Sequence, residues 1–323
     1  MQRRSLLLAA PAFAAAPARA PAWAQAWPAG PIRLIAPFPP GGSVDTILRL
    51  LAPSLQAGLG VPVVVENRSG AAGALGTAAA ARAAPDGQSW VLVFDSHATA
   101  NALNPQLGFD ARRDFVPVML VATAPMLLTT PLGRPWTSLA AVAAAARAKP
   151  DSVTYGTVGA GSLAHLTMEV WQQNTGLRLV HVPYRGGGPL AAAAAAGEVD
   201  LAIASRVGLG GQVGTRLRAL VQSGPRRSAA LPDLPTFAEA GFPGVVAEAF
   251  WGMLGPAGIP APVTARFHAA LAAALAEPEL RRKLEEGQGV DVVASTPKAF
   301  AAFLDQQIAE WGKVVRDRGI TVD

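Results

Sequence analysis

The chain has 323 residues, of which 51% are hydrophobic and 15% charged, and it contains no cysteine. So much apolar content with so little charge predicts a folded protein, because disordered chains show the opposite balance. The lack of cysteine excludes disulfides, thiolate nucleophiles, iron–sulfur ligation and cysteine-type zinc sites. The length suffices for one large domain or two mid-sized ones.

The net charge of +5 comes largely from the amino terminus. Residues 1–26 contain Arg3, Arg4 and Arg19 and no acidic residue, which leaves 24 of the 27 basic residues against 22 acidic ones, a net charge of +2. No long run of Lys or Arg follows. We therefore expect no nucleic-acid partner.

Residues 1–26 have the pattern of a secretory signal peptide. A basic pair precedes the apolar run 5–16, which is too short to span a bilayer, and small-residue cleavage sites follow. We predict cleavage after Ala26. The Arg3-Arg4 pair leaves both the general secretory route and the twin-arginine route open. No later stretch predicts a membrane helix, so we expect a soluble mature protein.

The first third of the mature chain alternates strands and helices. Strands are expected at 32–36, 63–65 and 89–94, with helices from Ser43 onward and over about 73–84. Ser43 is the expected N-cap of the first helix. One face of that helix carries Val44, Ile47, Leu48, Leu51 and Leu55. This order predicts a parallel sheet flanked by helices.

The second third repeats the alternation of strands and helices. We therefore expect a second sheet, with about one hundred residues of the chain forming each of the two sheets. A long amphipathic helix beginning at Thr296-Pro297 is expected to fold back on the first sheet. The strands expected in the second third are 118–122, 126–129, 152–157, 179–182 and 200–204, and the helices are 138–148, 162–174 and the Ala-rich run ending at 196. A strand at 218–222 is expected in the last third.

Two glycine-rich loops, at 39–43 and 159–162, each precede a predicted helix. The segment 159–164 formally matches the dinucleotide fingerprint, but the next strand ends at Pro183 without the acid that holds a ribose. Both loops place backbone amides at a helix N-terminus, which favours an anion. If they face each other across a cleft, a carboxylate held by backbone amides is the expected ligand.

Catalytic motifs are absent from the sequence. It has no G-x-S-x-G nucleophile elbow, no P-loop lysine and no H-E-x-x-H zinc motif. His97 is the histidine of most interest, because it follows the third predicted strand at the sheet edge where α/β proteins bind ligands. We therefore expect binding rather than catalysis, with no metal and no cofactor.

Ordered segments along the mature chain resemble the extracytoplasmic solute receptors of tripartite tricarboxylate transporters, the Bug family. The segments are 31–45, 64–68, 84–87, 156–162 with His165-Leu166, 181–186, 231–236 and 255–258. The resemblance implies an α/β, two-lobed periplasmic binding protein of the type II-like kind, each lobe a mainly parallel sheet flanked by helices. We expect domain 1 to comprise 27–123 and 225–323 and domain 2 to comprise 124–224, with hinge crossings near 123–126 and 222–235.

The resemblance further implies a periplasmic receptor that captures a small carboxylate, such as a di- or tricarboxylate, an acidic amino acid or an aromatic acid. It would deliver this ligand to the permease subunits of a tripartite transporter, and we expect a monomer. A ligand-sensing receptor for a signalling membrane protein and an enzyme on the same fold stay open as alternatives. The expected ligand-binding residues are Phe38, Pro40, Gly41, Gly42, Ser43, Asp45, Ser96, His97, Ala98, Thr99, Gly159, Ala160, Gly161, Ser162, His165, Tyr184, Arg185, Gly186, Ser205 and Arg206.

The sequence departs from the family pattern in two places. Residues 191–196 are alanines where relatives usually carry an Asp-Leu type pair, and Ser205-Arg206 stands where an acid and an Asn are common. If both positions lie near the ligand, the loss of an acid and the gain of Arg206 favour a more anionic ligand.

Overall fold

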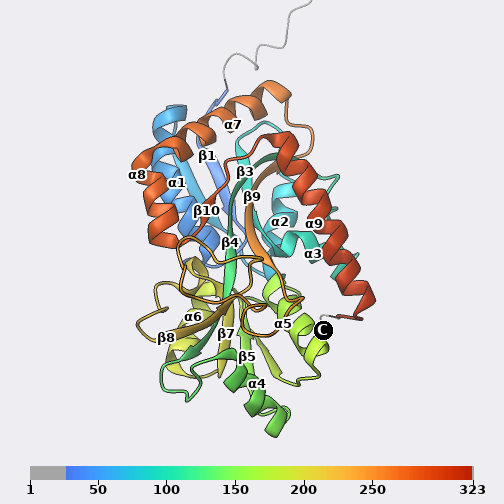
Figure 1. Cartoon of the computed structure of the whole chain (residues 1–323). Helices are drawn as coiled ribbons and strands as arrows, with labels where there is room; N and C mark the ends of the chain where they lie inside the picture. Colours follow the sequence, from blue (N-terminus) through green and yellow to red (C-terminus); the bar gives the residue numbers. More distant parts are fainter. Residues whose placement is uncertain (1–26, 322–323) are drawn as a thin grey trace, which may run out of the picture.

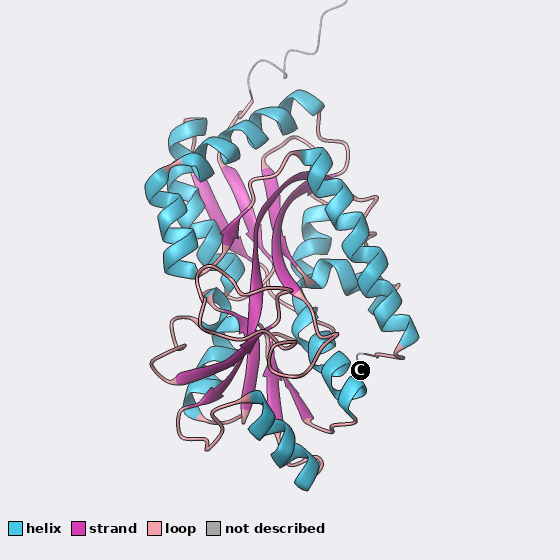
Figure 2. Ribbon diagram, viewed as in Figure 1, coloured by secondary structure: helices cyan, strands magenta, loops and turns pink. Residues whose placement is uncertain are grey.

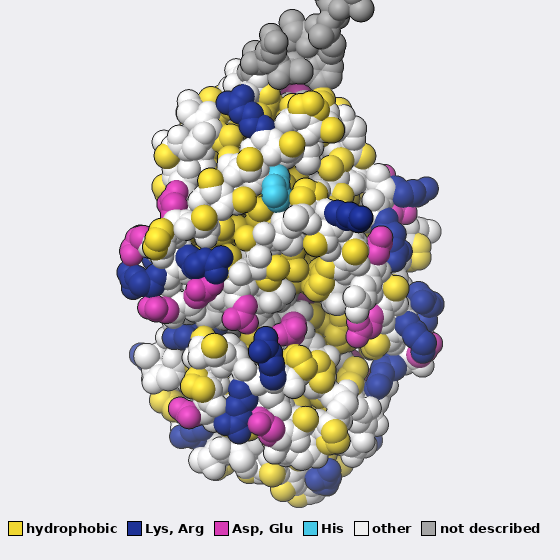
Figure 3. Space-filling view, turned by 45° about the horizontal axis from the view of Figure 1, so that its top comes forward, with side chains coloured by type: hydrophobic (Ala, Val, Ile, Leu, Met, Phe, Trp, Pro, Cys, Tyr) yellow, Lys and Arg dark blue, Asp and Glu magenta, His cyan; other side chains and the backbone are white. Residues whose placement is uncertain are grey.

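The computed structural model describes residues 27–321, so the predicted signal peptide lies outside the described residues. Within them the chain forms two lobes, drawn one above the other in Figure 1. None of the described helices is long and apolar enough to cross a bilayer. On the face shown in Figure 3, basic and acidic side chains are interspersed rather than gathered by sign.

The first lobe is built on a sheet with strand order β2-β1-β3-β9-β4. Its core is parallel, because β1 pairs in parallel with both β2 and β3, and β9 then pairs antiparallel with β3 and β4. The short strand β10 adds to the other edge of β4. The strands are β1 (Ile32–Ala36), β2 (Val63–Asn67), β3 (Ser89–Phe94), β4 (Phe115–Pro131), β9 (Glu248–Pro256) and β10 (Asp291–Val292).

Helices cover both faces of this sheet (Figure 2). One face carries α1 (Ser43–Leu59), α7 (Ala261–Ala276), α8 (Pro278–Arg282) and the π-helical turn η4 (Lys283–Gln288), and the other carries α2 (Ala74–Ala81), α3 (Ser96–Leu103) and α9 (Pro297–Asp317). Successive residues of a strand pack on opposite faces of the sheet. Leu34 and Leu92 belong to the hydrophobic core on the α1 face, and Ile35 and Val91 belong to the core on the α2 face. Strands buried on both faces are typical of a parallel sheet between helix layers.

The C-terminal helix α9 lies on the first lobe, as the sequence predicts. Phe303 packs edge-on against Phe250 of β9 at a centroid distance of 5.2 Å. Phe300 occupies the space beside Gly252, where an added Cβ would lie 2.1 Å from Cζ of that ring. The predicted buried face of α1 is also confirmed, whereas Ser43 is not its N-cap, because Gly42 holds that position.

The second lobe repeats the architecture on the C-terminal part of β4. Its strands β6, β5 and β7 are parallel, and β7 and β8 pair antiparallel with β4. The two-lobed α/β fold predicted from the sequence is thus confirmed. Its elements are α4 (Leu139–Ala148), β5 (Thr154–Thr157), α5 (Leu163–Thr175), β6 (Val180–Pro183), α6 (Gly187–Ala196), β7 (Leu201–Ser205), the 3₁₀ turn η3 (Val207–Leu209) and β8 (Leu217–Gln222).

The predicted break between strands 118–122 and 126–129 is wrong, because β4 is one strand that runs through both lobes (Figure 1). Pro125 lies opposite Glu248 of β9, and Met126 lies opposite Ser205 of β7. Proline usually weakens a strand because it lacks an amide hydrogen. Here pairing partners on both sides of Pro125 keep the chain extended, and the strand changes lobes at that residue.

The return connection, residues 223–247, packs on the second lobe. Phe237 and Phe242 contact Trp171 of α5 at centroid distances of 6.1 and 5.6 Å. The two ends of the connection meet, because the amide of Ala247 donates to the carbonyl of Ser223 at 2.9 Å. The strand β9 then enters the first lobe.

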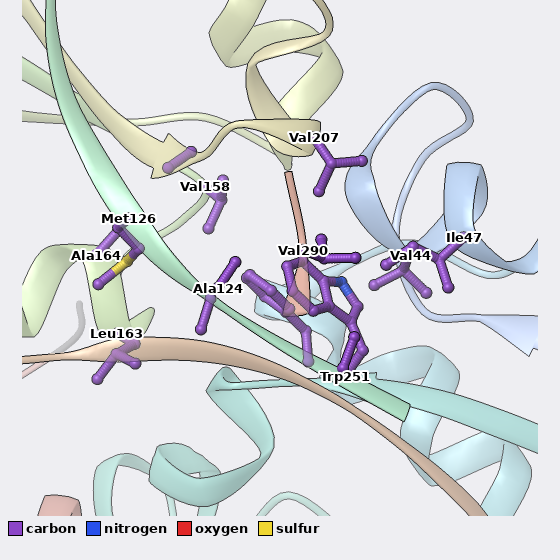
Figure 4. Packing of buried hydrophobic residues seen from close by; sticks show 14 of the residues in the cluster. Val44, Ile47, Ala124, Met126, Val158, Leu163, Ala164, Val207, Trp251 and Val290 are labelled. Atoms are coloured by element: carbon purple, nitrogen blue, oxygen red, sulfur yellow. The ribbon is translucent and has the colours of Figure 1, made fainter. Parts of the chain in front are cut away.

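Apolar packing continues from one lobe to the other beside β4. Figure 4 shows Ala124 and Met126 of β4 within the cluster that also holds Leu163 of α5 and Trp251 of β9. Helix α1 of the first lobe also contacts η3 of the second. The two lobes are therefore in contact in this structure.

Candidate functional site

A cavity of about 840 Å³ lies between the lobes. The first lobe contributes the loop after β1, the segment before and within α2, and the β3–α3 region with the loop that follows it. The second lobe contributes residues 158–161 and 183–185. This volume is within the range of small-molecule sites.

The loop after β1 is held in shape by Asp45. Its carboxylate accepts hydrogen bonds from the amide of Gly41 at 3.0 Å, Nε of Arg49 at 2.9 Å and Nδ2 of Asn67 at 3.0 Å. Burial pushes the pKa of Asp45 up, but these bonds bring it below its usual value. Asn67 also donates to the carbonyl of Phe38 at 3.0 Å. Phe38 lines the cavity, whereas Asp45 positions the loop.

Gly42 of this loop faces the second lobe rather than the cavity. A Cβ added to Gly42 would lie 3.8 Å from the amide nitrogen of Gly187, and one added to Gly188 would lie 3.3 Å from the carbonyl of Pro40. Ser43 accepts a hydrogen bond from Nε1 of Trp251 at 3.2 Å. Pro40, Gly41, Gly42 and Ser43 are not among the cavity-lining residues.

The β3–α3 region joins the two walls of the cavity. The hydroxyl of Ser96 donates to the carbonyl of Ala72 at 2.8 Å. The hydroxyl of Thr99 donates to the carbonyl of Gly161 at 2.9 Å, which is a direct hydrogen bond between lobes. Ser96, His97 and Thr99 line the cavity, whereas Ala98 is buried in the core of the first lobe.

His97 is a neutral, buried wall residue. Its Nε2 lies 3.1 Å from the carbonyl oxygen of Ala111, and its ring stacks on Phe109 at a centroid distance of 5.9 Å. Burial lowers the pKa of His97 to about 4, although the Ala111 carbonyl opposes this shift. The imidazole therefore carries no charge near neutral pH, so it contributes no cationic partner for an anion.

Asp95, directly after β3, is a site feature that the sequence analysis missed. It is 1% exposed, and neither carboxylate oxygen has a hydrogen-bond partner of ordinary geometry. Burial raises the pKa of Asp95 to about 8, against the opposing effect of the backbone amides of Leu163 and Ser96. A protonated Asp95 behind the cavity wall would not repel an anion.

Two histidines of the second lobe, His165 and His181, support the loop before α5. Ser162 is the N-cap of α5, and its hydroxyl also donates to the carbonyl of Gly159 at 2.7 Å. The amide of Gly161 donates to Nδ1 of His165 at 3.1 Å, and the His165 ring stacks on His181 at 4.0 Å. Burial lowers the pKa of both rings, that of His181 to about 3.

This loop presents Gly159, Ala160 and Gly161 to the cavity, while Ser162 and His165 hold it from behind. The glycines at 159 and 161 have φ angles of 141° and 75°, a conformation that other residues rarely adopt. The loop shape therefore depends on glycine.

The remaining predicted residues divide between the cavity and the lobe interface. Tyr184 and Arg185 line the cavity. A Cβ added to Gly186 would lie 3.1 Å from Pro39, and Ser205 accepts from the amide of Gly208 at 3.2 Å. Arg206 lies against Gly289 of the first lobe, so the structure gives it no contact with this cavity.

The segment 69–77 forms much of the first-lobe wall, although the sequence analysis treats it only as a turn and a helix. Ala71 and Ala72 both have positive φ angles, 47° and 49°. Such strained conformations of residues other than glycine cluster at functional sites. The sequence feature that could have predicted this wall is the string of small residues after Arg68, since alanine and glycine leave room for a ligand.

The charge of the lining favours an anion. Among the cavity-lining residues that the structure describes there is no Asp or Glu, and Arg185 is the charged side chain. The described part of the chain also holds no group of three His, Cys, Asp or Glu residues placed to bind a metal ion. The arrangement can enclose a small carboxylate between two walls.

Comparison with known proteins agrees with this geometry. The protein-family model described as tripartite tricarboxylate transporter family receptor matches residues 47–320. Protein BugT of Bordetella pertussis is 35% identical over 296 residues, which cover 91% of this chain and 90% of that protein.

Two similar solved structures hold carboxylates. An R. palustris protein with adipate is 31% identical, with a TM-score of 0.87 over 91% of this chain and 99% of that one. MatC of Rhodopseudomonas palustris with bound malate is 30% identical, with a TM-score of 0.83 over 90% of this chain and 100% of that one. The chain therefore belongs to the tripartite tricarboxylate transporter receptors of the Bug family, as its sequence segments indicate.

Proposed function

We propose that this protein is a periplasmic receptor that captures a small carboxylic acid between its lobes and delivers it to a tripartite-type permease. The observation that carries the proposal is the cavity itself, which both lobes line and which contains no acidic side chain among its described residues. Membership of a receptor family and the carboxylates held by two relatives support it.

Among the residues predicted from the sequence, nine form the proposed ligand site. Lobe 2 provides the glycine loop. The amides of Gly159, Gly161 and Ser162 already donate within the protein, which leaves the amide of Ala160 as the backbone donor of this loop for a carboxylate. Lobe 1 provides the aromatic and hydroxyl side chains of the opposite wall. The nine residues are Phe38, Ser96, His97, Thr99, Gly159, Ala160, Gly161, Tyr184 and Arg185.

Ligand capture works by closure of the lobes. A ligand that contacts both walls favours the closed form, because it binds that form more tightly than the open one. We place the hinge where β4 changes partners, at Pro125 and Met126, and where the return connection ends, at Ala247 and Glu248. Lobe 2 would then comprise 126–247. The division expected from the sequence places residues 225–247 in domain 1. The proposed boundary moves them to lobe 2, because Phe237 and Phe242 pack on Trp171 of that lobe.

The test is native mass spectrometry of the protein purified from its own periplasm, followed by thermal unfolding with a panel of carboxylic acids. We expect a mass offset of one small acid, or stabilisation by about 2.7 kcal/mol at a ligand concentration one hundred times Kd. Consumption of a panel compound, or no stabilisation by any carboxylate, contradicts the proposal.

A further inference from the structure

The glycine loop before α5 is anchored at both of its glycines. The amide of Gly161 donates to Nδ1 of His165 at 3.1 Å. The amide of Gly159 donates to the hydroxyl oxygen of Thr157 at 3.3 Å, and Nε2 of His181 lies 2.7 Å from that same oxygen. One histidine therefore holds Gly161 directly, and the other holds Gly159 through Thr157.

Ala160, between the two glycines, is the accessible part of this loop. It is the one residue of 159–162 that is not buried, and it lines the cavity. The amide of Ser162 donates back to the carbonyl of Gly159 at 3.2 Å. Within residues 27–321 the amide of Ala160 has no such partner. The loop therefore offers one backbone donor to the cavity, and the residues on either side of it set its position.

The hydrogen bond from Gly161 fixes where His165 carries its proton. An amide N–H can donate only to an unprotonated ring nitrogen, so Nδ1 is bare and the ring proton is on Nε2. That nitrogen lies 3.7 Å from Oε1 of Glu169, one helical turn along α5. Burial lowers the pKa of His165, against the opposing effect of Glu169. The ring is therefore neutral near neutral pH, and Nδ1 stays an acceptor.

Packing holds both imidazole rings in place. The rings of His165 and His181 stack with 4.0 Å between their centroids and 10° between their planes. Tyr155 stacks on His181 at 5.0 Å, and its hydroxyl donates to Oε1 of Glu169 at 2.9 Å. The side-chain amide of Gln172 donates to the same oxygen at 3.0 Å. The two histidines are therefore part of one stacked and hydrogen-bonded network.

This network belongs to the second lobe alone. By contrast, the hydrogen bond from the hydroxyl of Thr99 to the carbonyl of Gly161 crosses between the lobes, so it depends on closure. The anchoring of the loop by His165 and His181 does not depend on closure. The amide of Ala160 is therefore held in position before a ligand arrives, and a donor ordered in advance costs less entropy on binding.

We infer that His165 and His181 are positioning residues for the ligand carboxylate. By fixing Gly161 and Gly159 they aim the amide of Ala160 at the cavity, and neither ring contacts the ligand. The inference rests on the proposed function and deepens it. It also changes the role expected for His165 from the sequence, since neither histidine lines the cavity.

Replacements by Asn and Gln test the two histidines with opposite expectations. The side-chain oxygen of Asn can replace Nδ1 as an acceptor, and the longer Gln can reach the place of Nε2. His165→Asn should keep the acceptor for Gly161 and bind within about threefold of the parent protein, whereas His165→Gln should bind about tenfold more weakly. His181→Gln should keep the contact with Thr157, whereas His181→Asn should bind about tenfold more weakly.

Isothermal titration calorimetry of the mature protein measures these affinities. The probes are adipate and malate, the acids held by two relatives, and any other acid of the panel that stabilises the protein. His268→Asn and His268→Gln are the matched controls. Nε2 of His268 also lies near a backbone oxygen, that of Ser295, but on the first lobe and outside the cavity lining. Both controls should bind as the parent protein does.

Amide hydrogen exchange, followed for single residues by NMR, tests the loop without a ligand. In the ligand-free protein we expect slow exchange at Gly159 and Gly161 and fast exchange at Ala160. Exchange at Gly161 should become faster in His165→Gln and stay slow in His165→Asn. In the complex with a bound acid, exchange at Ala160 should slow.

The outcomes separate the inference from the proposed function. Opposite effects of Asn and Gln at the two positions, with an Ala160 amide that is protected only in the complex, support the inference. Equal effects of Asn and Gln at each position, or an Ala160 amide that still exchanges freely in the complex, overturn the inference and leave the proposed function intact. Failure of every acid to bind the parent protein overturns both.

Discussion

The two glycine-rich loops look alike in sequence but have different surroundings. Each follows a strand and precedes a helix, and each was an equal candidate for holding an anion. Residues 159–161 line the cavity. The loop at 39–43 contributes Pro39 to the lining, and the backbone of Gly41 and Gly42 lies beside Gly188 and Gly187 of the other lobe.

The difference shows that backbone freedom has two uses in this fold. In the loop before α5, glycines at φ angles of 141° and 75° shape a surface that a ligand can contact. In the loop before α1, Gly41 has a φ angle of 79°, which shapes the turn. Gly42 is extended and lies beside the other lobe, where an added Cβ would lie 3.8 Å from the amide nitrogen of Gly187. We therefore expect the first loop to act on the ligand and the second on closure.

The largest effect should come from a negative charge in the cavity loop. Ala160→Glu places a carboxylate beside the ligand carboxylate, and like charges at close range near a protein surface should weaken binding by about a hundredfold. Ala192→Glu is the control, because Ala192 is exposed on α6 outside the cavity. Titration calorimetry with the ligand found in the panel measures both. Unchanged affinity in Ala160→Glu would place the carboxylate elsewhere.

A smaller loss should follow a bulky side chain in the other loop. In Gly42→Val the Cβ meets the Pro39 carbonyl at 3.4 Å, and its methyl groups reach toward Gly187. We expect about tenfold weaker binding and a larger radius of gyration for the ligand-bound protein in small-angle X-ray scattering. Gly133→Val, with nothing within 4 Å of its added Cβ, is the control. Weaker binding without any change in shape would mean that Gly42 contacts the ligand.

The smallest effect on ligand affinity should come from Asp95, a buried residue whose carboxyl group faces the amide of Leu163 and whose role is in stability. Because its pKa is about 8 when folded against an ordinary value of 3.8, the folded state holds a proton that the unfolded state loses. The stability contribution of this group should therefore fall as pH rises from about 4 to 8. Asp95→Asn removes that dependence, so the variant should be more stable relative to the parent protein at pH 8 than at pH 4, by up to about 4 kcal/mol.

Urea unfolding of both proteins at pH 4, 6 and 8 measures this difference. A loss of stability that is the same at every pH would instead indicate an ionised Asp95 held by the Leu163 and Ser96 amides.

Much of the secondary structure follows from local patterns. The buried face of α1 has the expected spacing, and α9 begins at Thr296-Pro297 as the sequence predicts. β4 was misjudged because Pro125 is a local signal of interruption, whereas its pairing with β9 and β7 is a long-range one. Ser43 was misjudged for a similar reason, since its hydroxyl bonds Trp251 far along the chain.

The sequence by itself determined the alternation of strands and helices, the two-lobed architecture and the family, because these depend on periodicity and on ordered motifs. Only the tertiary structure decided which residues share the cavity. Arg206 and Gly42 are near the lobe junction but outside the lining, while Leu75, Leu103 and Phe109 lie within it. The direction a side chain takes depends on how distant segments pack, and a single sequence does not record that packing.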